Sequence, residues 1–176
     1  MIQYTGPFHQ NLYEGAGILY SETGIKVYEG TWKAGKKDGN GVLYDYLTSN
    51  IEYDGFWVNN KKELRGAFYD ENGVMMYDGE IKDDKKWGRG KLYFWDGSIE
   101  CQGNFVNDLK EGQITWWYYN GYKQYEGEMK AGLKDGKGTY WDPEGVKIYS
   151  GCWKADKMNG EGTVFYSNGK IEYEGE

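Results

Sequence analysis

Bulky and polar residues alternate along most of the chain, with glycines placed between them. From Tyr28 to Trp32, every second residue is an aromatic residue or a glycine, which is the period of a β-strand with one covered face. Residues 34–38 contain glycine and charged residues but no β-branched residue, which is typical of a turn. Residues 39–43 restore the two-residue period. The pattern predicts a β-hairpin, and the frequent glycines argue against helix because each costs about 1 kcal/mol in a helix interior.

The hairpin pattern recurs along the whole chain. A Tyr-x-Gly triplet, with Cys replacing Tyr once, starts at positions 4, 28, 53, 77, 101, 125, 149 and 173. Every step is 24 residues except the second, which is 25. We number positions 1–24 from each triplet and call the segments repeats one to seven, with a partial eighth repeat from residue 173. The regular spacing predicts one repeat domain over residues 1–176.

Each position of the repeat has its own residue type. Position 5 is bulky, positions 12 and 14 are mostly glycine, and positions 16 and 17 are apolar and then aromatic. Rings lying over glycines compensate for the packing that glycine lacks in a strand. Because a single hairpin cannot bury its own face, we expect an all-β, single-layer solenoid of stacked β-hairpins with almost no helix. Leu64, Cys101 and Ile114 depart from the pattern, and we expect altered stacking around them.

Composition and charge narrow the possible partners. The chain has 18 Tyr and 8 Trp, enough to build a core from rings, and a net charge of -7. This negative net charge argues against nucleic acid as a partner and makes binding to an anionic membrane surface less favourable. No stretch approaches the roughly 18 apolar residues of a membrane span, and the N-terminus lacks the basic start and apolar run of a signal peptide. We therefore expect a cytoplasmic protein.

Residues suited to catalysis are scarce. His9 is the only histidine, so no Ser-His-Asp or Cys-His pair recurs along the repeats and no His-rich metal site can form. We expect His9 to be a surface residue of the first repeat rather than a catalytic base. Cys101 and Cys152 lie two repeats apart, too far for a disulfide, and we expect both to be free. The carboxylates gather at turns, where solvation explains them. The sequence therefore predicts a non-enzymatic protein with no catalytic residue, metal or cofactor.

Several aromatic residues exceed what the repeat requires. Trp87 stands in a turn where other repeats carry Asp, Glu or Asn, and Trp95 and Tyr119 both occupy position 19. Local departures without a structural need are candidates for function, and Trp and Tyr are favoured interface anchors. We predict that another protein binds an aromatic face of the solenoid. Its proposed anchors are Trp87, Trp95, Trp117, Tyr119 and Trp141.

Three other binding modes stay open. Lysines at positions 9 and 10 would line one turn edge and meet anionic headgroups, although acidic residues at position 11 would neutralise part of that field. The residues of this edge are Lys36, Lys37, Lys61, Lys62, Lys85 and Lys86. The aromatic run 116–121 is similar to hairpins of choline- and glucan-binding cell-wall repeats, which implies glycan or choline binding. The C-terminal strand from residue 173 offers an edge for self-association.

The segment from Tyr28 to Tyr44 resembles a MORN repeat, whose pattern is YEGxWxxGxxxGxGxxxY, and segments 125–140 and 149–165 fit almost as well. The 24-residue period and the turn 166–170 resemble the bacterial variants of this family. The resemblance covers essentially the whole chain. It implies a stacked β-hairpin fold and a role as an interaction scaffold, in some members as a lipid-binding module. Some bacterial variants are described as antitoxin-like.

Overall fold

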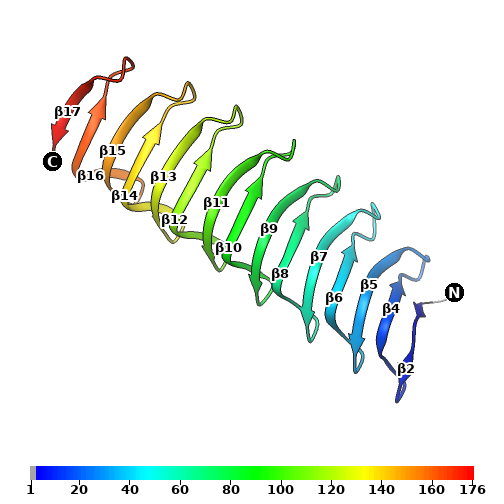
Figure 1. Ribbon diagram of the computed structural model, residues 1–176. Coiled ribbons are helices and arrows are strands. Elements are labelled where there is room, and N and C mark those ends of the chain that lie inside the picture. The colour runs from blue at the N-terminus through cyan, green and yellow to red at the C-terminus, as the bar shows by residue number, and fades with distance from the viewer. Residues whose placement is uncertain (1–2) are drawn as a thin grey trace. The chain divides into compact units, whose positions relative to one another are not determined.

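The computed structural model describes residues 3–176 (Figure 1). Every regular element within this range is a β-strand and none is a helix, which confirms the predicted all-β solenoid. The chain divides into two compact units, an N-terminal unit of residues 1–85 and a C-terminal unit of residues 86–176. Each unit is described by itself.

The strands form the predicted hairpins, but the turn predicted over residues 34–38 is shorter: only residues 34–35 form it, and residues 36–38 already belong to the next strand. The N-terminal unit contains β1 (Tyr4–Thr5), β2 (Phe8–His9), β3 (Leu12–Tyr13), β4 (Gly15–Tyr20), β5 (Lys26–Lys33), β6 (Lys36–Tyr44), β7 (Ile51–Val58), β8 (Lys61–Tyr69) and β9 (Met75–Lys82). The C-terminal unit contains β10 (Lys85–Tyr93), whose first residue closes the other unit, β11 (Ile99–Val106), β12 (Leu109–Trp117), β13 (Lys123–Lys130), β14 (Leu133–Trp141), β15 (Lys147–Lys154), β16 (Lys157–Phe165) and β17 (Ile171–Gly175).

Within each unit, neighbouring strands are antiparallel and follow one another in sequence order (Figure 1). The register of a regular repeat places Tyr28 opposite Leu43 and Gly30 opposite Gly41. The first repeat differs, because β1 pairs with β4 while β2 and β3 form a separate small ladder. Pro7 lies between β1 and β2; it has no backbone N–H to donate to a ladder, which accounts for the interruption.

The core consists of aromatic rings packed over glycines, as predicted. The position 1 tyrosine of the second repeat, Tyr28, is fully buried and its ring covers Gly30 and Gly41. The ring of Trp32, at position 5, packs edge-on against it with centroids 4.9 Å apart. The indole Nε1 of Trp57 donates to the carbonyl of Gly41 at 3.0 Å, which ties the third repeat to the second. Each repeat therefore completes the core of the preceding one.

The tyrosine hydroxyls also have a repeated role. Tyr28, Tyr53, Tyr77, Tyr125 and Tyr149 each donate a hydrogen bond to the backbone carbonyl three residues later. The strand is irregular there, because the register shifts between positions 3 and 5 in the second, sixth and seventh repeats. The hydroxyl thus satisfies a carbonyl beside the bulge. Burial raises the pKa of Tyr125 to about 12, so the hydroxyl stays a donor at neutral pH.

The expected disturbance at the irregular residues is small. Leu64 replaces a position 12 glycine with φ near 60°, similar to Gly15 and Gly112, and its side chain is exposed. Cys101 and Ile114 replace the tyrosine and glycine of one repeat, and both are buried. The methyl of Ile114 reaches toward Gly103, where other repeats place the phenol ring. The two substitutions therefore fill one space together.

Candidate interaction surfaces

The turns between positions 6 and 9, here called the short turns, are held by backbone geometry that the sequence encodes. Asn59 and Asn60 have φ values of 50° and 72°, and the equivalent turn residues of other repeats also have positive φ. Two successive residues with positive φ form the hairpin turn that matches strand twist, and they favour Gly, Asn and Asp. The residues at position 8 are accordingly Gly35, Asn60, Asp84, Asp108, Gly132 and Asp156.

Neighbouring short turns are hydrogen-bonded to each other. The backbone N–H of Asp156 donates to the carbonyl of Lys134 at 3.0 Å, and the N–H of Lys134 donates to Oδ1 of Asp156 at 2.8 Å. The pairs Asn60 with Lys37 and Asp84 with Lys62 are bonded in the same way. Sequence reasoning assigned these acidic residues to solvated turns and missed this role. The alternation of Asn or Asp with glycine at one position was the available signal.

The predicted lysine edge is divided between two environments. Lys36, Lys61 and Lys85 are exposed, and Lys61 forms an ion pair with Asp83. Lys37 instead lies over the core, with its Nζ 4.9 Å from the Tyr28 ring centroid and 4.6 Å from that of Trp57.

The other position 10 lysines are also turned inward or half-buried. Lys62 covers the rings of Tyr53 and Phe68 at 5.1 and 4.9 Å and pairs with Glu52, while Lys86 is half-buried. Burial lowers the pKa of Lys37. The position 10 lysines thus pack against or near the core, whereas Lys36, Lys61 and Lys85 at position 9 are exposed, Lys61 in an ion pair.

The turns that follow position 17, here called the long turns, carry Trp95, the most exposed aromatic residue described in the C-terminal unit. The side chains of Trp95 and Tyr119 are 70% and 50% exposed. Their rings are stacked, with centroids 5.7 Å apart and planes inclined by 18°. Phe94 packs edge-on against Tyr119 at 5.4 Å, and the Tyr119 hydroxyl is hydrogen-bonded to Asp96. We call Trp95 and Tyr119 the exposed stack.

The other predicted anchors lie elsewhere. Trp87, predicted to stand in a turn, instead lies half-buried on β10 near its short-turn end, and six residues of strand, roughly 20 Å, separate it from the end of β10 that precedes Trp95. Trp141 is half-buried beside Lys123, whose Nζ lies 5.9 Å from its centroid and also pairs with Glu126. Trp117 occupies the same repeat position as Trp141 and is also half-buried. The structure therefore brings together two of the five predicted anchors.

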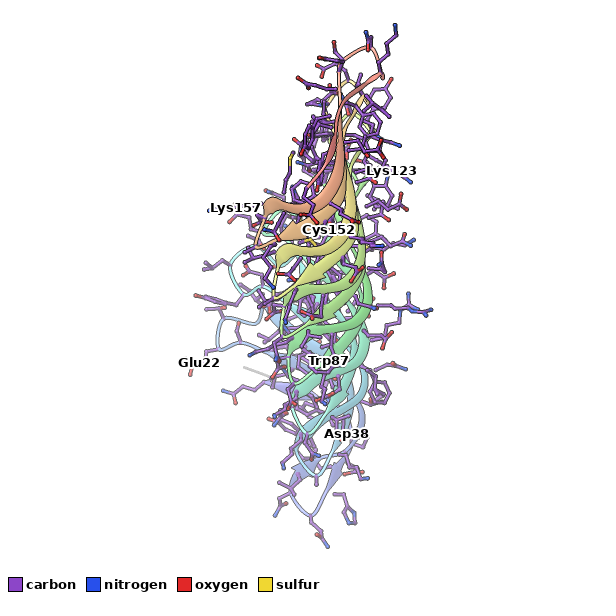
Figure 2. All side chains as sticks on the ribbon, turned by 90° about the vertical axis from the view of Figure 1, so that its left-hand side faces the viewer. Glu22, Asp38, Trp87, Lys123, Cys152 and Lys157 are labelled. Atoms are coloured by element: carbon purple, nitrogen blue, oxygen red, sulfur yellow. The ribbon has the colours of Figure 1, made fainter. Side chains whose placement is uncertain are left out.

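The two edges of the C-terminal unit are distinct. Figure 2 shows Lys157, which begins β16 after a short turn, and Lys123, which follows a long turn, on opposite sides of the ribbon. Cys152 lies between them. Interactions at the short turns of this unit and at the exposed stack would therefore engage different sides of it.

The aromatic run that resembled glycan-binding hairpins is distributed over several environments. Trp116 lies under Lys110, whose Nζ is 4.2 Å from its ring centroid. The hydroxyl of Tyr118 donates to the carbonyl of Trp141 at 3.0 Å. Tyr119 alone of these three joins the exposed stack. The run therefore does not form a continuous ring platform.

A shallow groove of about 750 Å³ crosses the C-terminal unit on the face that carries Glu126. Glycines form much of its lining, and the side chains of Thr139 and Ser150 are hydrogen-bonded there at 3.0 Å. Its charged lining consists of Lys137, Glu126, Glu161, Glu174 and Glu176. Cys152 also lines it, without a histidine among the lining residues. The groove is polar and acidic and holds no paired nucleophile and base.

Within residues 3–176, no group of three His, Cys, Asp or Glu side chains is arranged to hold a metal ion. No helix in this range is long and apolar enough to cross a membrane. His9 is exposed on β2.

The C-terminal strand β17 pairs with β16, and the side chains of Ile171 and Tyr173 on it are half-exposed to solvent. Self-association through this strand stays a prediction.

The two free cysteines are expected to differ sharply in reactivity. Cys101 is fully buried, and burial raises the pKa of its thiol to about 12, whereas Cys152 is half-buried in the groove. Since the thiolate is the reactive form, iodoacetamide at pH 8 should alkylate one thiol in the folded protein and two in denaturant. Cys152→Ser should abolish labelling of the folded protein; equal rates at both cysteines would contradict the predicted burial.

Comparison with known families agrees with the repeat structure. The family profile of the MORN repeat matches residues 28–46, 53–74, 77–99, 101–121, 125–147 and 149–171. These segments cover more than half of the chain; the first repeat, with its interrupted strand, is not among them. No curated protein sequence matches the chain. MORN repeats are commonly protein- or membrane-interaction repeats and are generally non-catalytic. The repeats, their phase and their hairpin structure together show that this chain belongs to the MORN-repeat family.

Proposed function

We propose that this chain is a non-catalytic repeat scaffold that binds another protein through the exposed stack. The observation that carries the proposal is the 70% exposure of Trp95 at the tip of a long turn. The equivalent turns form with Glu22, Glu71 or Ser167 at the same position, so the turn does not require an aromatic ring. A large ring presented to water without a folding role is typical of an interface anchor.

The exposed stack is held in place before any partner binds. Phe94 supports Tyr119 from its edge, and the Tyr119 hydroxyl is hydrogen-bonded to Asp96. Asp96 in turn accepts hydrogen bonds from the N–H and hydroxyl of Ser98 at 2.9 and 2.6 Å. A rigid aromatic pair loses little conformational entropy on binding. This preorganisation favours a protein-binding role for the two rings.

The lysine edge supports headgroup binding less well. Lys37 and Lys62 are engaged with rings of the core, and Lys61 is paired with Asp83. The net charge of -7 also opposes approach to an anionic membrane. These contacts and the net charge favour a protein partner over an anionic lipid surface.

Site-specific photo-cross-linking in the native cell tests the proposed function. Benzophenone side chains replacing Trp95 or Tyr119 should each yield the same cross-linked protein of defined mass. The control is Tyr46, which is an exposed position 19 aromatic of the N-terminal unit on the longer turn of the 25-residue repeat and should not yield that product. Capture of the same partner should fall at least tenfold in Trp95→Ala, because interface anchors contribute about 2 kcal/mol or more.

Two results would overturn the proposal. The first is an identical set of cross-links from Trp95, Tyr119 and Tyr46, which would indicate non-specific contact. The second is no protein cross-link at Trp95 together with binding to anionic vesicles that is lost in Lys36→Ala/Lys85→Ala. That outcome would assign the function to the lysine edge.

A further inference from the structure

Cations packed on aromatic rings are a recurring interaction within this chain. The Nζ of Lys110 lies 4.2 Å from the ring centroid of Trp116, and that of Lys134 lies 4.7 Å from Trp153. Such contacts are favourable because the ring face is electron-rich, and they strengthen where water is excluded. In these pairs the chain supplies both the ring and the cation.

The exposed stack lacks an internal cation. Within residues 3–176, the ring contacts of Trp95 and Tyr119 are with each other and with Phe94, and no lysine or arginine covers either ring. The nearest charged residue along the chain is Asp96, a carboxylate. Hydrogen bonds from Ser98 hold the pKa of Asp96 below its ordinary value, so it is ionised at neutral pH.

Acidic residues outnumber basic ones in the long turns of the C-terminal unit. The four long turns of the C-terminal unit span residues 94–98, 118–122, 142–146 and 166–170. They carry Asp96, Asp142 and Glu144 against a single cation, Lys170. Exposed ring faces beside carboxylates complement a partner group that is both cationic and flat.

We propose that the exposed stack binds an arginine side chain on an extended segment of the partner protein, with its guanidinium against the Trp95 ring and Asp96 as counter-charge. This inference rests on the proposed function and names the chemistry of the partner. Arginine is preferred over lysine because its planar, weakly hydrated guanidinium can stack on a ring and still donate to a carboxylate. The lysine ammonium is more strongly hydrated and makes a point contact.

A peptide-binding assay tests this inference. The probe is a fluorescently labelled nine-residue peptide that contains three arginines separated by Gly and Ser. Its binding to the full chain is measured by fluorescence anisotropy. Matched peptides replace every arginine with lysine or with glutamate. Wild type should bind the arginine peptide about threefold more tightly than the lysine peptide and show no binding of the glutamate peptide. Trp95→Ala should weaken arginine-peptide binding about tenfold, and Asp96→Asn about threefold.

Tyr166→Ala is the control, because Tyr166 is 50% exposed on another long turn of the same unit and its loss should leave binding unchanged. Equal binding of arginine and glutamate peptides, or unchanged binding in Trp95→Ala, would overturn the inference. The two proposals can fail separately. A partner cross-linked at Trp95 through a segment without arginine would refute the inference alone, whereas peptide binding at Trp95 without any cellular partner would refute the proposed function alone.

Discussion

Replacing Gly138 with alanine is expected to lower the free energy of unfolding by about 3 kcal/mol. The new Cβ would lie 2.6 Å from Cε2 and Cζ of Tyr125 and would also press on its hydroxyl. Tyr125 is fully buried and its hydroxyl donates to the carbonyl of Glu128 at 2.8 Å. The ring cannot move without losing both its burial and this hydrogen bond.

Gly121→Ala is the matched control for this prediction. Gly121 has a φ of 86° and no atom would lie within 4 Å of the new Cβ. Its replacement should therefore cost only the strain of the left-handed backbone, about 1 kcal/mol. Urea unfolding followed by circular dichroism and by tryptophan fluorescence would measure both variants. Equal destabilisation by the two substitutions would contradict crowding of the Tyr125 ring as the reason for Gly138, because only Gly121 has a positive φ.

The second large effect is expected from the Cys101 and Ile114 pair, tested as a double-mutant cycle. Ile114→Gly removes a buried side chain and should cost about 4 kcal/mol. Cys101→Tyr places a phenol where Ile114 already lies and should cost about 2 kcal/mol. The double variant has Tyr and Gly at positions 1 and 14 of the fifth repeat. It therefore reproduces there the packing that Tyr125 and Gly138 show in the sixth repeat. It should unfold within about 1 kcal/mol of wild type, because each change relieves the other.

The same unfolding measurements applied to wild type, both single variants and the double variant give the coupling energy. A strongly favourable coupling, on the order of 5 kcal/mol, would establish that the Cys101 and Ile114 pair can replace the usual Tyr and Gly pair only when both residues change together. This exceeds the usual range for neighbouring residues because each single substitution leaves either a void or an overlap. Additive effects would instead show that Cys101 and Ile114 occupy independent sites.

The hairpins, their spacing and the residues of the core could be read from the sequence because they depend on short-range rules, whereas the predicted turn over residues 34–38 was too long. Alternation places Tyr28 and Trp32 on one face, and the glycines at positions 12 and 14 indicate positive φ or close ring contact. The exchange at Cys101 and Ile114 could not be anticipated, since it depends on which side chains meet across neighbouring strands. The repeat pattern identifies both residues as irregular, but it does not show that the side chain of Ile114 fills the space left by the missing tyrosine.

The binding surface was only partly predictable. Trp95 and Tyr119 were identified because position 19 does not require aromatic residues, but the same reasoning grouped them with Trp87, which lies toward the other end of its strand. Counting lysines at positions 9 and 10 likewise predicted one basic edge. The pleat sends adjacent side chains to opposite faces, so Lys36 faces solvent while Lys37 covers the rings of Tyr28 and Trp57.

By itself, the sequence determined the repeat, its phase, the all-β hairpin structure and the glycine-covered aromatic core. These properties follow from periodicity and from the few residues that tolerate a positive φ, and both are local. The tertiary structure alone decided that Asp156 links adjacent turns, that the position 10 lysines complete the core, and that Trp95 stacks on Tyr119. Those outcomes depend on contacts between residues about 19 to 24 positions apart, which form only when one hairpin is packed against the next.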